Sequence, residues 1–180
     1  MFTAMLQTLC MTIDKTVMLT GKTAALLMPI LAFIVAFEVF SRYVLDSPTI
    51  WAFDLSLFLF GYIAALGGAY AQQRRAHINV DILYNRVPEK ILCIFNLLTY
   101  SLAIFFLALI IAMSLGKYEE AIEFDYRRQS EWAPPMFHFW IMMMVASALF
   151  IAQLGRDLLS EIYFIFTNQV LLAQEHSDGH

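Results

Sequence analysis

Glu38 and Arg42 are the ionisable residues whose type and spacing most readily suggest chemistry in this sequence. A separation of four places them on one face of a helix, with the acidic residue on the N-terminal side, the order that a helical ion pair prefers. They lie near the end of a long apolar stretch, and a carboxylate inside a membrane span is by default a candidate for binding a proton or an ion. The alternative is a structural ion pair whose arginine extends its charged end to the membrane interface. Because Glu38 lies near the end of the stretch and beside a partner, we favour the structural pair.

Asp54 is the next candidate, one turn into the following apolar stretch. Its carboxylate could take up a proton or a cation, but a carboxylate near a helix N-terminus is also stabilised by the helix dipole. Arg42 lies close by in sequence, across a short connection. The sequence therefore predicts a structural cluster in which Glu38, Arg42 and Asp54 hold two helices together.

Small residues recur through the second apolar stretch at a spacing of four. Gly61 with Ala65, and Ala64 with Gly68, fit the small-xxx-small pattern that lets membrane helices approach closely. The pattern predicts a tight contact between helices, either within this chain or against a partner.

The remaining residues suggest no catalytic or cofactor site. His138 is the one histidine inside a predicted span, whereas a membrane cytochrome needs paired axial ligands for each haem. The sequence contains no nucleophile–base pairing, phosphate-binding loop or Cys/His spacing typical of a metal site. We therefore expect neither an enzyme nor a metal or cofactor site in this chain.

Four long apolar stretches must position these residues. They cover about 23–43, 51–71, 91–115 and 136–155 in a chain of 180 residues that is 61% hydrophobic. A helix needs about 20 apolar residues to cross the hydrocarbon core, where backbone groups must pair within their own segment. The sequence predicts an all-α membrane protein with four transmembrane helices in a single membrane domain, residues 1–180, and it excludes an ordinary soluble protein.

The segments that flank the four spans are also rich in apolar residues. In residues 1–22, apolar side chains recur at spacings of three and four, which predicts an amphipathic N-terminal helix. This helix either lies in the membrane interface or extends the first span on its cytoplasmic side. The C-terminal tail, residues 156–180, contains a further apolar run from Leu158 to Leu172, which we interpret as an extension of the fourth helix or as an interfacial helix.

The basic residues predict which ends of the spans are cytoplasmic. With a cytoplasmic N-terminus, the inside segments carry more lysine and arginine than the outside segments, so the positive-inside rule predicts that both termini are cytoplasmic. The inside residues are Lys15, Lys22, Arg74, Arg75, Arg86, Lys90 and Arg156. The outside residues are Arg42, Lys117, Arg127 and Arg128.

Residues at the span ends agree with this layout. We expect Ser47 and Pro48 to supply an N-cap and a first-turn proline for the second span. Trp51, Trp132 and Trp140 lie near the predicted outer ends, where indole rings favour the membrane interface.

Two motifs together resemble a known family. The first runs Phe37-Glu38-Val39-Phe40-Ser41-Arg42-Tyr43-Val44, followed by Ser47-Pro48, Trp51 and Asp54. The second runs from Gly67-Gly68-Ala69 to Arg74-Arg75-Ala76-His77-Ile78-Asn79-Val80-Asp81. This pattern, in the first half of the chain, is similar to the small membrane subunit of tripartite ATP-independent periplasmic (TRAP) transporters, the DctQ-type family.

The resemblance implies four membrane helices beside a much larger membrane subunit that carries the substrate and sodium sites. A periplasmic binding protein would deliver an organic anion such as a carboxylate, and the small subunit would brace the large one in a bacterial or archaeal inner membrane. We expect membrane lipids as further partners and no nucleic acid. The candidates for a structural or partner interface are Glu38, Arg42, Trp51, Asp54, Gly61, Gly68, Arg74, Arg75, His77 and Asp81.

Other functions compete with this one. A self-sufficient small carrier could act as a homo-oligomer with Glu38 as its proton-coupled site, but carriers usually have broken helices or internal repeats around a midplane site. A membrane enzyme or electron carrier would need a polar catalytic cluster or cofactor ligands. The outer connection from Lys117 to Trp132, with charges of both signs, is either a solvated linker or a surface that meets a soluble partner.

Overall fold

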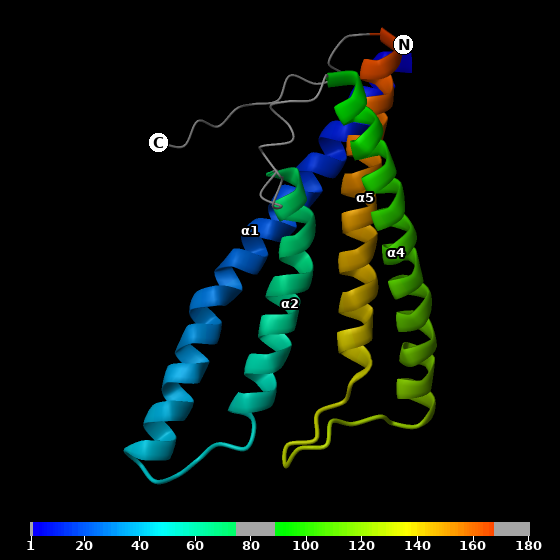
Figure 1. The fold of residues 1–180 in the computed structure, drawn as a ribbon. Helices are drawn as coiled ribbons and strands as arrows, with labels where there is room; N and C mark the ends of the chain where they lie inside the picture. The colour runs from blue at the N-terminus through cyan, green and yellow to red at the C-terminus, as the bar shows by residue number, and fades with distance from the viewer. Residues whose placement is uncertain (1, 75–88, 168–180) are drawn as a thin grey trace.

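Long α-helices make up most of the described residues (Figure 1). The computed structural model describes residues 2–74 and 89–167. Its helices are α1 (Phe2–Tyr43), α2 (Ala52–Gln73), α4 (Glu89–Glu123) and α5 (Phe137–Thr167). Each contains a segment long and apolar enough to cross a membrane. The prediction of an all-α membrane protein with four spans is confirmed.

The first span continues without a break into the N-terminal segment, because α1 runs through Pro29 and includes nearly all of residues 1–22. Of the two interpretations of this segment, the continuous helix favours an extension of the first span. Threonine hydroxyls in the extension donate to the carbonyl one turn earlier, from Thr12 to Thr8 at 2.8 Å and from Thr16 to Thr12 at 2.9 Å. These polar side chains are therefore satisfied within their own helix.

The third and fourth helices also exceed their predicted spans. α5 continues from residue 155 to Thr167, which agrees with an extension of the fourth helix, while residues 168–180 lie outside the described part. α4 continues from residue 115 to Glu123. The first part of the predicted outer connection is therefore helical, and the loop between α4 and α5 is confined to residues 124–136.

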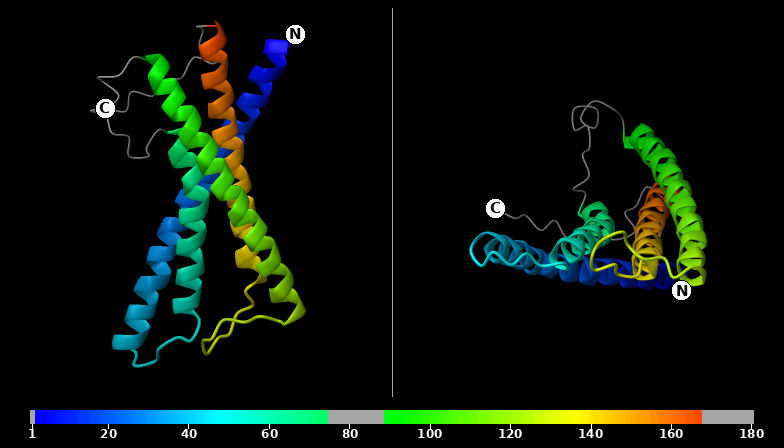
Figure 2. Two further views of the ribbon diagram at one scale, coloured as in Figure 1. Left: turned by 45° about the vertical axis from the view of Figure 1, so that its right-hand side comes forward. Right: turned by 90° about the horizontal axis from the view of Figure 1, so that it is seen from below.

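The helices pack in the order α1, α2, α5, α4, so that α1 and α4 lie at the two ends of an open layer (Figure 2). α4 packs on α5, α2 lies between α1 and α5, and the early part of α1 also reaches α5. Large apolar side chains remain exposed on the outer helices, including Phe33 on α1 and Leu102 on α4. Exposed apolar surface of this kind fits a lipid environment rather than water.

The layer has two different ends. The loop end carries the connections 44–51 and 124–136, and here the α1/α2 pair diverges from the α4/α5 pair (Figures 1 and 2). The terminal end carries the start of α1 and the last turns of α5, so these two ends of the helical layer lie on the same side (Figure 1).

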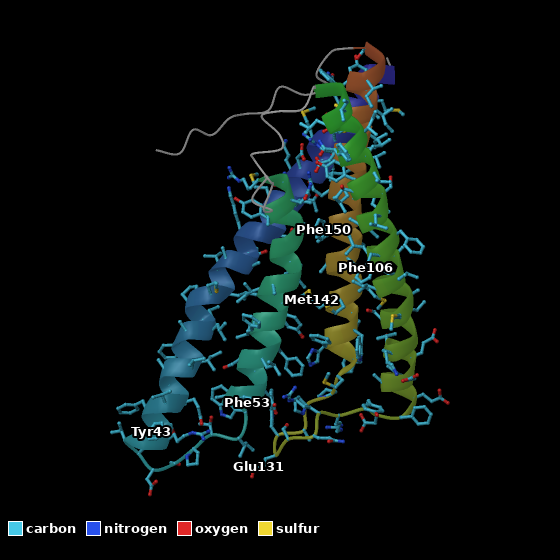
Figure 3. The ribbon with its side chains drawn as sticks, viewed as in Figure 1. Tyr43, Phe53, Phe106, Glu131, Met142 and Phe150 are labelled. Carbon is cyan, nitrogen blue, oxygen red and sulfur yellow. The ribbon has the colours of Figure 1, made fainter. Side chains whose placement is uncertain are left out.

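Glycines allow close contact along the seams between helices. A Cβ at Gly61 would lie 3.3 Å from the ring of Phe139, and one at Gly68 would lie 3.4 Å from the ring of Phe150, which lies between α2 and α5 (Figure 3). A Cβ at Gly21 of α1 would overlap the ring of Tyr70 of α2. The two glycines of the predicted pattern therefore serve a contact within this chain, whereas Ala64 is exposed.

The expected cap of the second span is wrong. α2 begins at Ala52, its N-cap is Trp51, and no side chain caps it. Ser47 instead closes the end of α1, because its amide donates to the Ser41 carbonyl at 3.0 Å and its carbonyl accepts from the Ser41 hydroxyl at 2.5 Å. The Trp51 indole stacks on Phe37, with ring centroids 6.2 Å apart.

Candidate functional site

Glu38 and Arg42 form the predicted ion pair at the last turns of α1. The Nη2 and Nε atoms of Arg42 lie 2.5 and 3.0 Å from Oε1 of Glu38. The other carboxylate oxygen, Oε2, accepts hydrogen bonds from the Thr49 amide at 3.1 Å and from the Thr49 hydroxyl. Both oxygens of Glu38 are therefore engaged: Oε1 in an ion pair within α1, and Oε2 in holding the 44–51 connection against this helix.

Asp54 does not join this pair. Its side chain is 1% exposed and lies with residues of the 124–136 loop. Nε of Arg128 lies 2.5 Å from Oδ1 of Asp54, and the Ser130 hydroxyl donates to Oδ2. The predicted cluster of Glu38, Arg42 and Asp54 is therefore wrong, because Asp54 faces the connection that leads into α5 and finds its partners there.

The 124–136 loop is folded rather than an extended linker. Backbone hydrogen bonds join the two halves of the loop. The Arg128 amide donates to the Pro134 carbonyl and the Met136 amide donates to the Tyr126 carbonyl, both at 3.0 Å. Ala133 adopts a left-handed conformation with φ of 45°, which is uncommon for a residue with a side chain. Its amide donates to Ser130 Oγ at 3.2 Å, so the hydroxyl that binds Asp54 also supports this turn.

A second polar cluster lies toward the terminal end, where α2 ends. The Nη2 and Nε atoms of Arg156 on α5 lie 3.0 and 3.2 Å from Oδ2 of Asp14 on α1. The Nη1 atom of the same guanidinium lies 3.1 Å from Oδ1 of Asp157. The side-chain amide of Gln73 on α2 donates to the Asp14 carbonyl at 2.8 Å. One arginine thus bridges two carboxylates while α2 contacts the same region.

Amide side chains complete this cluster around Asp157. Gln72 of α2 donates to Oδ2 at 3.1 Å, and Gln153, which is fully buried, donates to Oδ1 at 3.2 Å. Gln72 and Asp157 lie about 20 residues from the starts of α2 and α5, or ~30 Å along each helix. The cluster therefore lies about one hydrocarbon thickness from the loop end of the helices. At this distance polar groups again reach a membrane interface, on the opposite side from the loops.

This Arg156 cluster was missed by sequence reasoning. Its signal was available, since Gln72-Gln73 and Arg156-Asp157 interrupt otherwise apolar helices. What the sequence could not provide was the partner, because Asp14 and Arg156 are 142 positions apart.

His138 is part of an aromatic contact between α2 and α5. Its Nδ1 is hydrogen bonded to the Tyr62 hydroxyl, and its ring meets the edge of Phe58 with centroids 4.7 Å apart. Within residues 2–74 and 89–167, no group of three His, Cys, Asp or Glu side chains is arranged to hold a metal ion.

The remaining predicted residues fall at the end of α2 and beyond it. The Arg74 guanidinium lies over the Tyr70 ring at 5.4 Å from its centroid, and Nε donates to the Tyr70 hydroxyl at 3.1 Å. Arg75, His77 and Asp81 lie outside the described residues.

Two grooves open between helices at the loop end. The α1–α2 groove has a volume of about 360 Å³ and is lined by Val35, Glu38, Val39, Arg42, Tyr43, Ala52, Phe53 and Ser56. The α2–α5 groove has a volume of about 290 Å³ and is lined by Leu57, Phe58, Phe60, Gly61, Arg128, Met136 and Phe139. Both have mainly apolar walls and include one arginine.

Residues 31–163 match the profile of a family described as the DctQ component of tripartite ATP-independent periplasmic transporters. A segment of 54 residues is 41% identical to the sialic acid TRAP transporter permease protein SiaT of Haemophilus influenzae, covering 30% of this chain and 9% of that protein. A segment of 64 residues is 31% identical to the small permease protein SiaQ of a Vibrio cholerae sialic acid TRAP transporter, covering 36% and 37%. A segment of 74 residues is 26% identical to the small permease protein DctQ of a C4-dicarboxylate TRAP transporter from Vibrio cholerae, covering 41% and 32%. The chain thus spans less than two-fifths of the length of each of these relatives.

Proposed function

Because this chain belongs to the family of DctQ components of TRAP transporters, we propose that it braces a large membrane subunit during sodium-coupled uptake of an organic anion. The observation that carries the proposal is the extent of the family match. Residues 31–163 begin within α1 and end within α5, so the match includes parts of the first and last helices and all of the sequence between them. The family is a transporter component, which is why catalysis forms no part of the proposed role.

A large permease subunit is the proposed stable partner. The segment similar to this chain makes up 9% of the Haemophilus permease, so that protein is several times longer than this chain. A sequence that occurs both as a separate small chain and as part of a longer permease fits a physical association between the two. Organic carboxylates are the proposed substrates, since the relatives are named for sialic acid and C4-dicarboxylates.

The bracing role is supported by how the helices are fastened. Asp54 ties the 124–136 loop to α2 at one end, and Arg156 ties α1 to α5 at the other. The described helices are continuous, whereas the moving parts of secondary transporters usually contain broken helices. A chain whose helices are held together at both ends of the layer is suited to remain in place while another subunit moves.

The alternative of a self-sufficient proton-coupled carrier receives less support. Its proposed site, Glu38, already binds Arg42 through one oxygen and Thr49 through the other. These contacts explain the residue as a fastening of the 44–51 connection, and nothing in its surroundings favours a transport role.

We further propose that both termini are cytoplasmic and that the 124–136 loop faces the periplasm, where a binding protein would approach. The terminal end carries Lys15, Lys22, Arg74 and Arg156, and the loop end carries Arg42, Lys117, Arg127 and Arg128. Three further basic residues favour this orientation: Arg75 and Arg86 follow α2 in the sequence, and Lys90 belongs to the first turn of α4.

Reconstitution tests the proposal. Proteoliposomes would contain the large permease subunit with or without this chain, together with the periplasmic binding protein, a sodium gradient and a radiolabelled carboxylate. Uptake that requires both membrane chains and the gradient supports the proposed role. Uptake by this chain alone, driven by a proton gradient, would support the alternative carrier and reject the bracing role.

A further inference from the structure

The α1–α2 groove combines an apolar interior with the Glu38–Arg42 ion pair at its edge. Val35 and Val39 of α1 line it from one side and Phe53 of α2 from the other. Val39 and Phe53 keep 51% and 65% of their surfaces exposed, so the groove opens to the surroundings of the protein rather than into a closed interior. Arg42 stands in the last turn of α1, beside the 44–51 connection.

The contacts beside the groove hold the 44–51 connection against α1 at this end. The Thr49 amide and hydroxyl are bound to Glu38, and Trp51 is stacked on Phe37. These contacts fix the connection between α1 and α2 across the end of the groove. These contacts therefore fix the outline of the groove at its loop end.

An apolar groove at membrane depth needs an apolar occupant. Water is scarce in the hydrocarbon region, and an empty groove would lose the dispersion contacts of its lining atoms. A flexible hydrocarbon chain can follow a groove between helices and replace those contacts.

Arg42 adds a specific polar partner for such a chain. Its Nε and Nη2 atoms contact a single oxygen of Glu38, which fixes the guanidinium at the edge of the groove. Half of its side chain stays exposed. A guanidinium at the membrane interface forms charge-assisted hydrogen bonds with phosphate oxygens, and its planar shape suits them.

We propose that the α1–α2 groove binds one phospholipid of the adjacent leaflet, with an acyl chain between Val39 and Phe53 and the phosphate against Arg42. The α2–α5 groove has a similar lining, because its walls are apolar and it also includes an arginine, Arg128. Both arginines are ion-paired, but the Arg42 side chain is 50% exposed and the Arg128 side chain 28%, so the α1–α2 groove offers the more accessible cation.

Native mass spectrometry of the full-length chain, purified in mild detergent with the membrane subunit that it binds, tests this site. The probes are dioleoylphosphatidylglycerol and dioleoylglycerol, which has the same chains without a phosphate. Val39→Phe fills the groove, and Leu115→Phe is its control at a similarly exposed position of α4. Arg42→Gln removes the cation, and Lys117→Gln is its control at another exposed, ion-paired cation.

We expect saturable binding of the phospholipid to the unchanged chain and a loss of about tenfold in affinity for each groove variant. Arg42→Gln should leave dioleoylglycerol binding unchanged, whereas Val39→Phe should weaken both lipids. The two control variants should bind both lipids with the same affinity as the unchanged chain. All variants should elute from gel filtration with the same profile, which shows that they are folded and assembled. Equal phospholipid binding by the unchanged chain and Val39→Phe would overturn the proposal. So would a photocrosslinker at position 39 that reacts with a protein subunit instead of lipid.

Discussion

Nε of Arg128 lies 2.5 Å from the buried Oδ1 of Asp54, which joins the loop between α4 and α5 to the first turn of α2. The contact is an ion pair without hydrogen-bond alignment between these two atoms. The Ser130 hydroxyl, which donates to the other carboxylate oxygen, supplies the directional contact. A residue near the start of the second span therefore determines where the last loop lies.

Removal of the Asp54 carboxylate should destabilise the protein. Asp54→Ala removes both the ion pair with Arg128 and the hydrogen bond from Ser130, and the loss of these contacts should cost about 1–3 kcal/mol. SDS-induced unfolding in mixed micelles, followed by circular dichroism, measures the change in the free energy of unfolding. Asp125→Asn is the matched control, because Asp125 pairs with Arg127 on the exposed surface of the same loop. Equal stability of the two variants would show that the buried pair does not hold the loop.

Gly21→Ala should disturb the contact between α1 and α2. The added Cβ would overlap the Tyr70 ring, and such overpacking costs about 1–3 kcal/mol. Gly67→Ala is the control, since nothing lies within 4 Å of a Cβ there and alanine favours the helix. Thermal unfolding of the two variants in the same detergent provides the comparison. A midpoint for Gly21→Ala at or above that of Gly67→Ala would contradict the observed close approach.

Asp14 and Arg156 should be energetically coupled although they lie at opposite ends of the sequence. A double-mutant cycle with Asp14→Asn and Arg156→Gln should give an interaction free energy of about 1–3 kcal/mol, as for residues that share one polar network. The cycle for Lys117 and Glu120, an exposed pair within α4, should give a value near zero. Additive effects of Asp14→Asn and Arg156→Gln would mean that this bridge does not fasten α1 to α5.

Glu38→Gln should leave uptake by the assembled transporter largely intact. Glutamine keeps the length of the side chain and can still accept the hydrogen bond from the Thr49 amide, so the 44–51 connection should stay in place. Uptake of labelled substrate and the amount of co-purified large subunit are measured together, with Glu119→Gln of α4 as the control. Loss of uptake with normal assembly, in Glu38→Gln alone, would favour the proton-coupled carrier.

The sequence was sufficient for the features that depend on nearby residues. The apolar stretches predicted all four spans, because backbone pairing in lipid requires helices of that length. The spacing of Glu38 and Arg42 predicted their ion pair, since positions four apart meet on any helix. Gly61 and Gly68 were likewise assigned to a close helix contact, and both face α5 rings.

Long-range partners could not be derived in the same way. Asp54 was assigned to Arg42 because they are close in sequence, but its partner Ser130 is 76 positions away. Gly21 stands alone in the N-terminal segment, and only the position of Tyr70 explains why a larger residue would not fit. Both depend on how the helices tilt and on the order in which they pack, which local spacing does not encode.

The order α1, α2, α5, α4 also determines what the chain can enclose. A closed bundle of four helices surrounds a central axis, but the described helices form a layer with two broad sides. A solute that crossed the bilayer beside this layer would be shielded from lipid on one flank only. The described helices by themselves therefore form one wall of such a passage and do not enclose it.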